Sequence, residues 1–164
     1  MKNELTLTTP GDREIRIVRA FEAPRRLVFD CYFKPELVKR WMSGPEGWTF
    51  TVCEIDLRVG GRYRNVLTGP DGTQMAWGGV YQEVIVPERV VSLEKYDMDW
   101  TGGETEGTLE FAENTRKTTV TTRLVYASQA ARDGALKSGM AEGMAAGFDR
   151  IEALLTLPEF GGER

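Results

Sequence analysis

Histidine is absent from this chain of 164 residues. Imidazole is the side chain on which Ser/His/Asp triads, Cys/His dyads and histidine-ligated metal sites depend near neutral pH. The absence therefore excludes those kinds of catalytic and metal centre. We expect neither a metal site nor a cofactor.

Cysteine and long apolar runs are also scarce. Cys31 and Cys53 are the only cysteines, and they form no CxxC motif, which is typical of reduced core residues. No apolar run approaches the roughly 20 residues that a membrane-spanning helix needs. The N-terminal sequence MKNELTLTTPGDREI lacks the apolar core of a signal peptide. We therefore expect a cytoplasmic protein without a membrane span.

Positive charge is not in excess, because 25 acidic residues outnumber 21 basic ones and the net charge is -4. A pI near 5.1 opposes the electrostatic attraction that non-specific nucleic-acid binding requires. The apolar share of 41% is ordinary for a globular protein, and the length suits one domain over residues 1–164. Nucleic acid is thus not an expected partner.

The first part of the chain combines a strand with two short helices. Residues 14–22, EIRIVRAFE, alternate apolar and polar side chains with the period of a half-buried strand. Pro24 and Pro35 each suit the first turn of a helix. Apolar residues then recur on one face of each helix: Leu27, Val28, Cys31 and Tyr32 in the first, and Leu37, Val38 and Trp41 in the second.

Six further segments are rich in β-branched and aromatic residues, which predicts strands. Short links with glycine, proline, aspartate or asparagine separate them, so we expect antiparallel neighbours. Together with residues 14–22 they make a seven-stranded sheet. The six segments are 48–57, 62–67, 74–84, 89–96, 105–111 and 117–126.

The last predicted element is a long helix over residues 129–155, with Ser128 as its N-cap and Pro158 just beyond its end. Apolar residues recur along it every three or four positions, and only the concave face of a curved sheet offers a surface broad enough to bury them. The prediction is an α+β fold whose antiparallel sheet wraps this helix. The apolar residues are Leu136, Met140, Met144, Phe148, Ile151 and Leu155.

This order of elements resembles the helix-grip superfamily, also called SRPBCC, which includes START domains, Bet v 1-like proteins and polyketide cyclases. Within it the chain is similar to the AHSA1-like branch, the activator of Hsp90 ATPase homologues, over about residues 14–156. The matching phrases are FEAPRRLVFD, KPELVKRWMSGPEGW, VCEIDLRVGGRYR, GPDGT, GVYQEVIVPERVV and GMAEGMAAGFDRIEALL.

The resemblance implies a cavity between sheet and helix. Relatives often carry tryptophan where this chain has Met144, and a second tryptophan where it has Met42, so the shape of that cavity is expected to differ. The eukaryotic Hsp90 activator is similar to this chain only through its C-terminal domain, so we do not expect an Hsp90-type chaperone as a partner.

The cavity candidates are aromatic residues on the strands and apolar residues on the long helix. Gly139, Gly143 and Gly147 accompany the helical candidates at a period of four; they serve either close packing or ligand volume, and we favour packing. The candidates are Trp48, Tyr63, Trp77, Tyr81, Tyr96, Met140, Met144 and Phe148, with Trp100 as a further aromatic residue.

Charged residues on the predicted strands allow two interpretations. Inside a cavity, a carboxyl would acquire a pKa suited to acid/base chemistry; on the solvent face, the same residues would form ion pairs. Their spacing fixes no mutual geometry, so no catalytic residue is assigned. These residues are Glu54, Asp56, Arg62, Arg64 and Glu83.

Three functions follow. The leading hypothesis is the binding of a small apolar or aromatic molecule between sheet and helix. The second is a polyketide cyclase-like enzyme that orients its substrate and moves a proton through a carboxyl or a tyrosine. The third is a protein-interaction module of the stress response, including the Hsp90-associated role that the family name suggests, or a homodimer that buries an apolar outer patch. Binding is expected ahead of catalysis.

Overall fold

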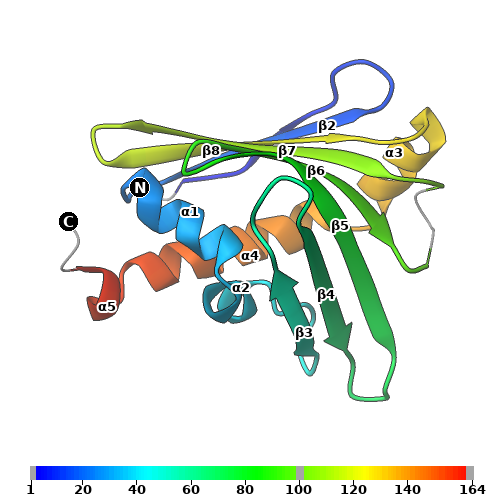
Figure 1. Cartoon of the computed structure of the whole chain (residues 1–164), viewed down its shortest axis with the longest axis horizontal. Helices are drawn as coiled ribbons and strands as arrows, with labels where there is room; N and C mark the ends of the chain where they lie inside the picture. The colour runs from blue at the N-terminus through cyan, green and yellow to red at the C-terminus, as the bar shows by residue number, and fades with distance from the viewer. Residues whose placement is uncertain (1–2, 99–101, 162–164) are drawn as a thin grey trace.

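One antiparallel sheet organises the chain in the computed structural model, which describes residues 3–98 and 102–161 (Figure 1). Its eight strands lie in the order β1-β2-β8-β7-β6-β5-β4-β3, so only the pairing of β2 with β8 joins distant parts of the sequence. The strands are β1 (Thr6–Thr8), β2 (Glu14–Phe21), β3 (Thr49–Ile55), β4 (Arg62–Thr68), β5 (Gln74–Ile85), β6 (Arg89–Tyr96), β7 (Thr105–Asn114) and β8 (Lys117–Val125).

The predicted α+β helix-grip architecture is confirmed, but the predicted number of seven strands is wrong by one. The additional strand is β1, whose Leu7 pairs with Ile17 at the edge of the sheet. Three residues are too few to show an alternating pattern, and β1 adds only one inward-facing leucine to the sheet.

The two short helices are α1 (Arg25–Phe33) and α2 (Pro35–Trp41), as the two prolines indicate. Pro24 occupies the N-cap of α1, whereas Pro35 is the first residue of α2, where its missing N–H leaves no hydrogen bond unmade. Both helices turn their apolar faces inward, and the Trp41 indole N–H donates to the Cys31 carbonyl oxygen at 2.7 Å.

The prediction of one continuous helix over residues 129–155 is wrong. The structure has α3 (Gln129–Lys137) and α4 (Met140–Leu155), followed by α5 (Pro158–Gly161). Gly139 interrupts the helix with a φ of +83°, a left-handed conformation that glycine adopts without a Cβ penalty. The predicted N-cap is confirmed, because the Ser128 Oγ accepts from the Ala131 N–H at 3.1 Å.

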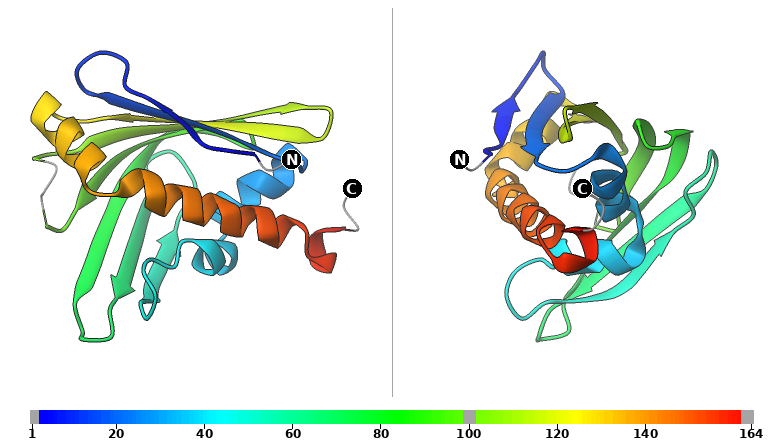
Figure 2. Two further views of the ribbon diagram at one scale, coloured as in Figure 1. Left: turned by 180° about the vertical axis from the view of Figure 1, so that it is seen from behind. Right: turned by 90° about the vertical axis from the view of Figure 1, so that its left-hand side faces the viewer.

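Helix α4 lies along the concave side of the sheet, with α1 and α2 beside it (Figures 1 and 2). The Phe21 ring of β2 meets the Phe148 ring of α4 edge-on at 5.9 Å between centroids. The Arg19 guanidinium of β2 lies 3.0 Å from the Glu152 carboxylate of α4. These contacts identify the inner face of the sheet. None of the helices over residues 3–98 and 102–161 is long and apolar enough to span a membrane.

Candidate functional site

The strand register shows which side chains share the inner face with Arg19 and Phe21, because residues directly opposite each other in an antiparallel pair point to the same side. From Ile15 the row passes through Leu124 and Gly107 to Ser92 and Tyr81. The alternate residues of β6 and β4 continue it, so Glu94, Tyr96 and Tyr63 also point inward.

Two ends of this inner face differ in packing. We define the packed end by Phe21, Phe111, Val120, Phe148 and Ile151, all of which are buried. We define the tyrosine end by Tyr63, Tyr81, Glu94, Tyr96 and Tyr126. Of these, Tyr63, Glu94 and Tyr96 are only half-buried although they face the interior.

A single row of the sheet builds the centre of the tyrosine end. Tyr63 of β4 lies opposite Gly79 of β5, and Gly79 lies opposite Glu94 of β6. A Cβ on Gly79 would lie 2.7 Å from the Tyr63 Oη, so the ring occupies the space that a side chain at this position would fill. The Tyr63 hydroxyl thereby reaches across β5 and donates to the Glu94 Oε2 at 2.6 Å.

Desolvation is the main electrostatic effect on Glu94. Burial raises the pKa of the Glu94 carboxyl above its ordinary value, and the hydrogen bond from Tyr63 only partly opposes this shift. Burial and then the charge of Glu94 raise the pKa of Tyr63 and Tyr96, and raise the pKa of Tyr126 to about 12. The carboxyl thus acts electrostatically on tyrosines from several elements.

No positive charge compensates Glu94 from the sheet. Arg19 is the only Lys or Arg at an inward-facing strand position in the described part of the chain. Its guanidinium pairs with Asp149 and Glu152 of α4 and lies over the rings of the packed end. Within the described residues, Glu94 is therefore a half-buried acid that a hydroxyl stabilises and that no cation of the sheet neutralises.

The structure gathers most of the aromatic candidates predicted from the sequence on one face. Tyr63 and Tyr81 have ring centroids 5.1 Å apart, and Trp77 and Tyr96 have centroids 5.7 Å apart. Trp48 is separate from them, because it precedes β3 and its ring packs against Gly69 in the β4–β5 turn. Trp100 lies outside the described residues.

The helical candidates differ in burial. Phe148 is 2% exposed and belongs to the packed end. Met140 and Met144 are half-buried and pack against the edge of the hydrophobic core together with Leu136. The Met140 and Met144 side chains thus keep accessible surface that a small molecule can contact.

The three glycines of the C-terminal segment serve different purposes. Gly139 breaks the helix, and a Cβ on Gly147 would lie 3.2 Å from the Trp41 ring, so this glycine allows close packing of α4 on α2. A Cβ on Gly143 would meet nothing within 4 Å. The stripe thus has no common role.

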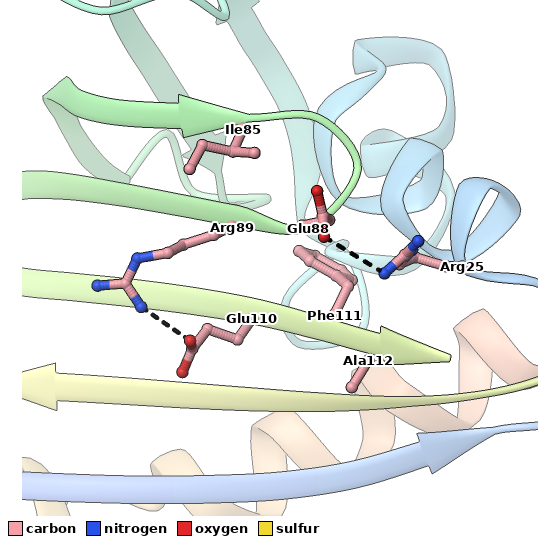
Figure 3. Close-up of a pocket in the computed structure, with 7 residues that line it drawn as sticks. All are labelled: Arg25, Ile85, Glu88, Arg89, Glu110, Phe111 and Ala112. Carbon is pink, nitrogen blue, oxygen red and sulfur yellow. Dashed lines mark hydrogen bonds and ion pairs between the residues drawn. The ribbon is translucent and has the colours of Figure 1, made fainter. Parts of the chain in front are cut away.

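Two hollows lie on the protein surface, and each shares lining residues with the inner face: Phe111 lines the smaller, and Tyr63 and Gly79 line the larger. The smaller, about 390 Å³, lies beside the start of α1, where Arg25 pairs with Glu88 and Arg89 pairs with Glu110 across its rim (Figure 3). Its charges are therefore satisfied within the protein. The hollow does not face α4.

The larger hollow, about 710 Å³, lies on the outer face of the sheet over Gly78, with Glu54, Arg62 and Arg64 among its lining residues. Asp56 pairs with Arg58, and Glu83 with Arg89. Of the charged residues singled out in the sequence, Asp56, Arg64 and Glu83 therefore form ion pairs at the surface, as the solvent-face interpretation predicts, and Glu54 and Arg62 line the outer hollow. In residues 3–98 and 102–161, no cluster of three or more His, Cys, Asp or Glu side chains could hold a metal ion.

Sequence reasoning missed Glu94, Ser92 and Tyr126. In β6 the inward set is Val90, Ser92, Glu94 and Tyr96, and the outward set is Val91, Leu93 and Lys95. Each set mixes apolar and polar residues, so alternation alone does not tell which one is buried. The Gly78-Gly79 pair in β5 was the available signal, since glycine inside a strand often marks the close approach of another group.

Comparisons with known proteins agree on one family. The model of the family "Activator of Hsp90 ATPase homolog 1-like protein" matches residues 22–156. A crystal structure from Rhodobacter sphaeroides is similar with a TM-score of 0.87 and 28% identity, covering 93% of this chain and 97% of that one. No match was found among curated proteins.

Two further solved structures have the same fold. A crystal structure from Mycobacterium smegmatis has a TM-score of 0.79 and 27% identity, covering 93% of this chain and 97% of that one. The solution structure of an AHSA1-like protein from Aeromonas hydrophila has a TM-score of 0.66 and 20% identity, covering 91% of this chain and 95% of that one.

Proposed function

We propose that the chain, which belongs to the family of Activator of Hsp90 ATPase homolog 1-like proteins, binds a small and mostly apolar molecule between the inner face of its sheet and α4. One observation carries the proposal: side chains at the tyrosine end face the interior, yet Tyr63, Glu94 and Tyr96 keep accessible surface. A packed core would bury them fully.

The chemistry of this region suits such a ligand. Tyr63 and Tyr96 offer aromatic faces, and the flexible thioethers of Met140 and Met144 adapt to apolar shapes. The hydrogen-bonded pair of Tyr63 and Glu94 supplies a polar anchor among these surfaces. Apolar walls with a few convergent polar groups are typical of small-molecule sites.

The experiment is a titration with N-phenyl-1-naphthylamine, a neutral apolar probe that fluoresces when it leaves water. We expect saturable binding to the wild-type protein and at least tenfold weaker binding to Met144→Trp, because the indole fills the space beside α4. Met98→Trp is the matched control, since the Met98 side chain is 78% exposed.

Circular dichroism and thermal unfolding verify that both variants fold. If Met144→Trp and wild type bind the probe equally well, the proposed location is wrong. If the wild type shows no saturable binding, the proposed function is wrong.

The pair of Tyr63 and Glu94 also favours a second function, a cyclase-like enzyme. A desolvated carboxyl hydrogen-bonded to a tyrosine is suited to moving a proton to or from a bound substrate. This hypothesis predicts that Glu94→Gln abolishes turnover of a bound polyketide-like substrate while its dissociation constant changes less than about threefold. Turnover that persists in Glu94→Gln would exclude the mechanism.

A further inference from the structure

We infer that the polar group of the ligand is a protonated amine, seated against the Glu94 carboxylate among the surrounding tyrosine rings. The inference rests on the proposed function and specifies the ligand class for the same site. The ligand is then a cationic amphiphile, with an apolar or aromatic body and one primary or secondary ammonium group.

The first argument is the charge balance of the inner face. Among the described residues, Glu94 has one hydrogen-bond partner, the Tyr63 hydroxyl, and the inward-facing cation Arg19 is held by Asp149 and Glu152. A buried carboxylate without a cation is costly, and a ligand ammonium would compensate it. A ligand carboxylate would add a second negative charge and is disfavoured.

The second argument is the aromatic surroundings of the carboxyl. The Tyr63 ring lies over Gly79 beside Glu94. The Tyr81 ring is tilted against the Tyr63 ring, with 5.1 Å between the two ring centroids. The charge of Glu94 acts on Tyr96 and Tyr126 as well. Tyrosine faces attract cations, and desolvation strengthens that attraction. Carboxylate and aromatic rings therefore favour the same ligand group.

The third argument is that no competing cation faces Glu94 from the described strands other than the paired Arg19. The nearest basic residues along β6 and β4 are Lys95, Arg62 and Arg64, and all three point to the outer face. Arg64 is held there by Asp97 at 2.6 Å. Neutralisation of Glu94 thus depends on a proton or on a ligand.

The experiment compares three probes of the same shape: 1-naphthylmethylamine, 1-naphthylmethanol and 1-naphthoate. At pH 7.5 we expect the amine to bind the wild-type protein at least tenfold more tightly than the alcohol, and the carboxylate to bind most weakly. The advantage of the amine should shrink as the pH falls and Glu94 becomes protonated. Isothermal titration calorimetry measures all three.

Variants attribute the preference to Glu94. Glu94→Gln keeps an acceptor for Tyr63 but removes the charge, so we expect the amine and the alcohol to bind it within twofold of each other. Glu54→Gln on the outer face is the matched control and should retain the wild-type preference. Equal binding of the amine and the alcohol by the wild type, or a preference that survives in Glu94→Gln, would overturn the inference.

The three probes also separate this inference from the function on which it rests. Binding of the alcohol without preference for the amine leaves the proposed site intact and contradicts only the ligand class. Failure of all three probes to bind contradicts both.

Discussion

The packed end and the tyrosine end lie on the same face of the same sheet, yet they are built differently. At the packed end Phe111 and Phe148 are each 2% exposed, and their rings meet Phe29 and Phe21 at 5.1 and 5.9 Å. At the tyrosine end Tyr63, Glu94 and Tyr96 stay half-buried although they face the interior. The comparison indicates that one end is tightly packed, while the other leaves inward-facing side chains partly accessible.

The two ends also differ in the partners of their inward-facing charged residues. Arg19 is 2% exposed and its guanidinium bonds two carboxylates of α4, so it ties β2 to that helix. Within the described part of the chain, Glu94 receives one hydrogen bond, from the Tyr63 hydroxyl. The ion pairs of Arg19 connect two elements of the structure, whereas Glu94 has no such counter-ion on the described strands.

The largest expected difference between the ends lies in the cost of removing a side chain. Phe148→Ala should destabilise the protein by about 3–5 kcal/mol, because a fully buried ring leaves a cavity. Met144→Ala, four residues earlier on α4, should cost less than about 2 kcal/mol, because its side chain is only half-buried. Urea unfolding measures both. Equal costs would show that the two ends are packed alike.

The next effect concerns Gly79. Gly79→Ala should cost about 1–3 kcal/mol, because its Cβ would collide with the Tyr63 ring and with the Leu93 carbonyl oxygen and displace Tyr63 from Glu94. Gly107→Ala is the matched control on β7, where the nearest atoms lie at an ordinary 3.7 Å. It should be neutral, or stabilising by up to about 1 kcal/mol. Equal thermal stabilities of the two variants would contradict the account of this row.

A smaller contrast exists within α4. Gly143→Ala should stabilise the protein by up to about 1 kcal/mol, since alanine is the better helix former and its Cβ meets no neighbour. Gly147→Ala should lose that gain or reverse it, since Trp41 lies 3.2 Å from the added Cβ. Urea unfolding of both variants tests whether α4 is tightly packed only beyond Met144.

The smallest expected effect is the pH dependence of Glu94→Gln, because Glu94 keeps accessible surface. When folding raises the pKa of a carboxyl, the folded protein loses stability as the pH rises from the pKa of that carboxyl in the unfolded chain, ordinarily 4.5, towards its pKa in the folded protein. Glu94→Gln should therefore be more stable than wild type at neutral pH, and the difference should disappear below pH 4.5. Thermal unfolding across pH provides the measurement, and a variant less stable than wild type at pH 7 would contradict the sign.

Much of the fold could be predicted from local signals. The residues of β6 match the predicted segment 89–96, and Pro35 and Ser128 begin their helices as expected. The break at Gly139 was missed because the apolar spacing continues across it, and a backbone φ is not visible in such a pattern.

The site was only partly predictable, because it depends on register. The sequence shows that Tyr63, Gly79 and Glu94 are strand residues, but only the pairing of β4, β5 and β6 places them in one row. The mixed polarity of both faces of β6 concealed Glu94. The aromatic candidates were easier to select, since Trp77 and Tyr81 are large apolar side chains in any register.

The most direct test of the central claim is methyl NMR of the protein labelled at its methionine ε-methyl groups. Titration with N-phenyl-1-naphthylamine should shift the Met140 and Met144 signals in a saturable way and leave the signal of Met98, which is 78% exposed, unchanged. Unperturbed Met140 and Met144 methyl groups at saturating probe, or a shift confined to Met98, would contradict a binding site between the tyrosine end and α4.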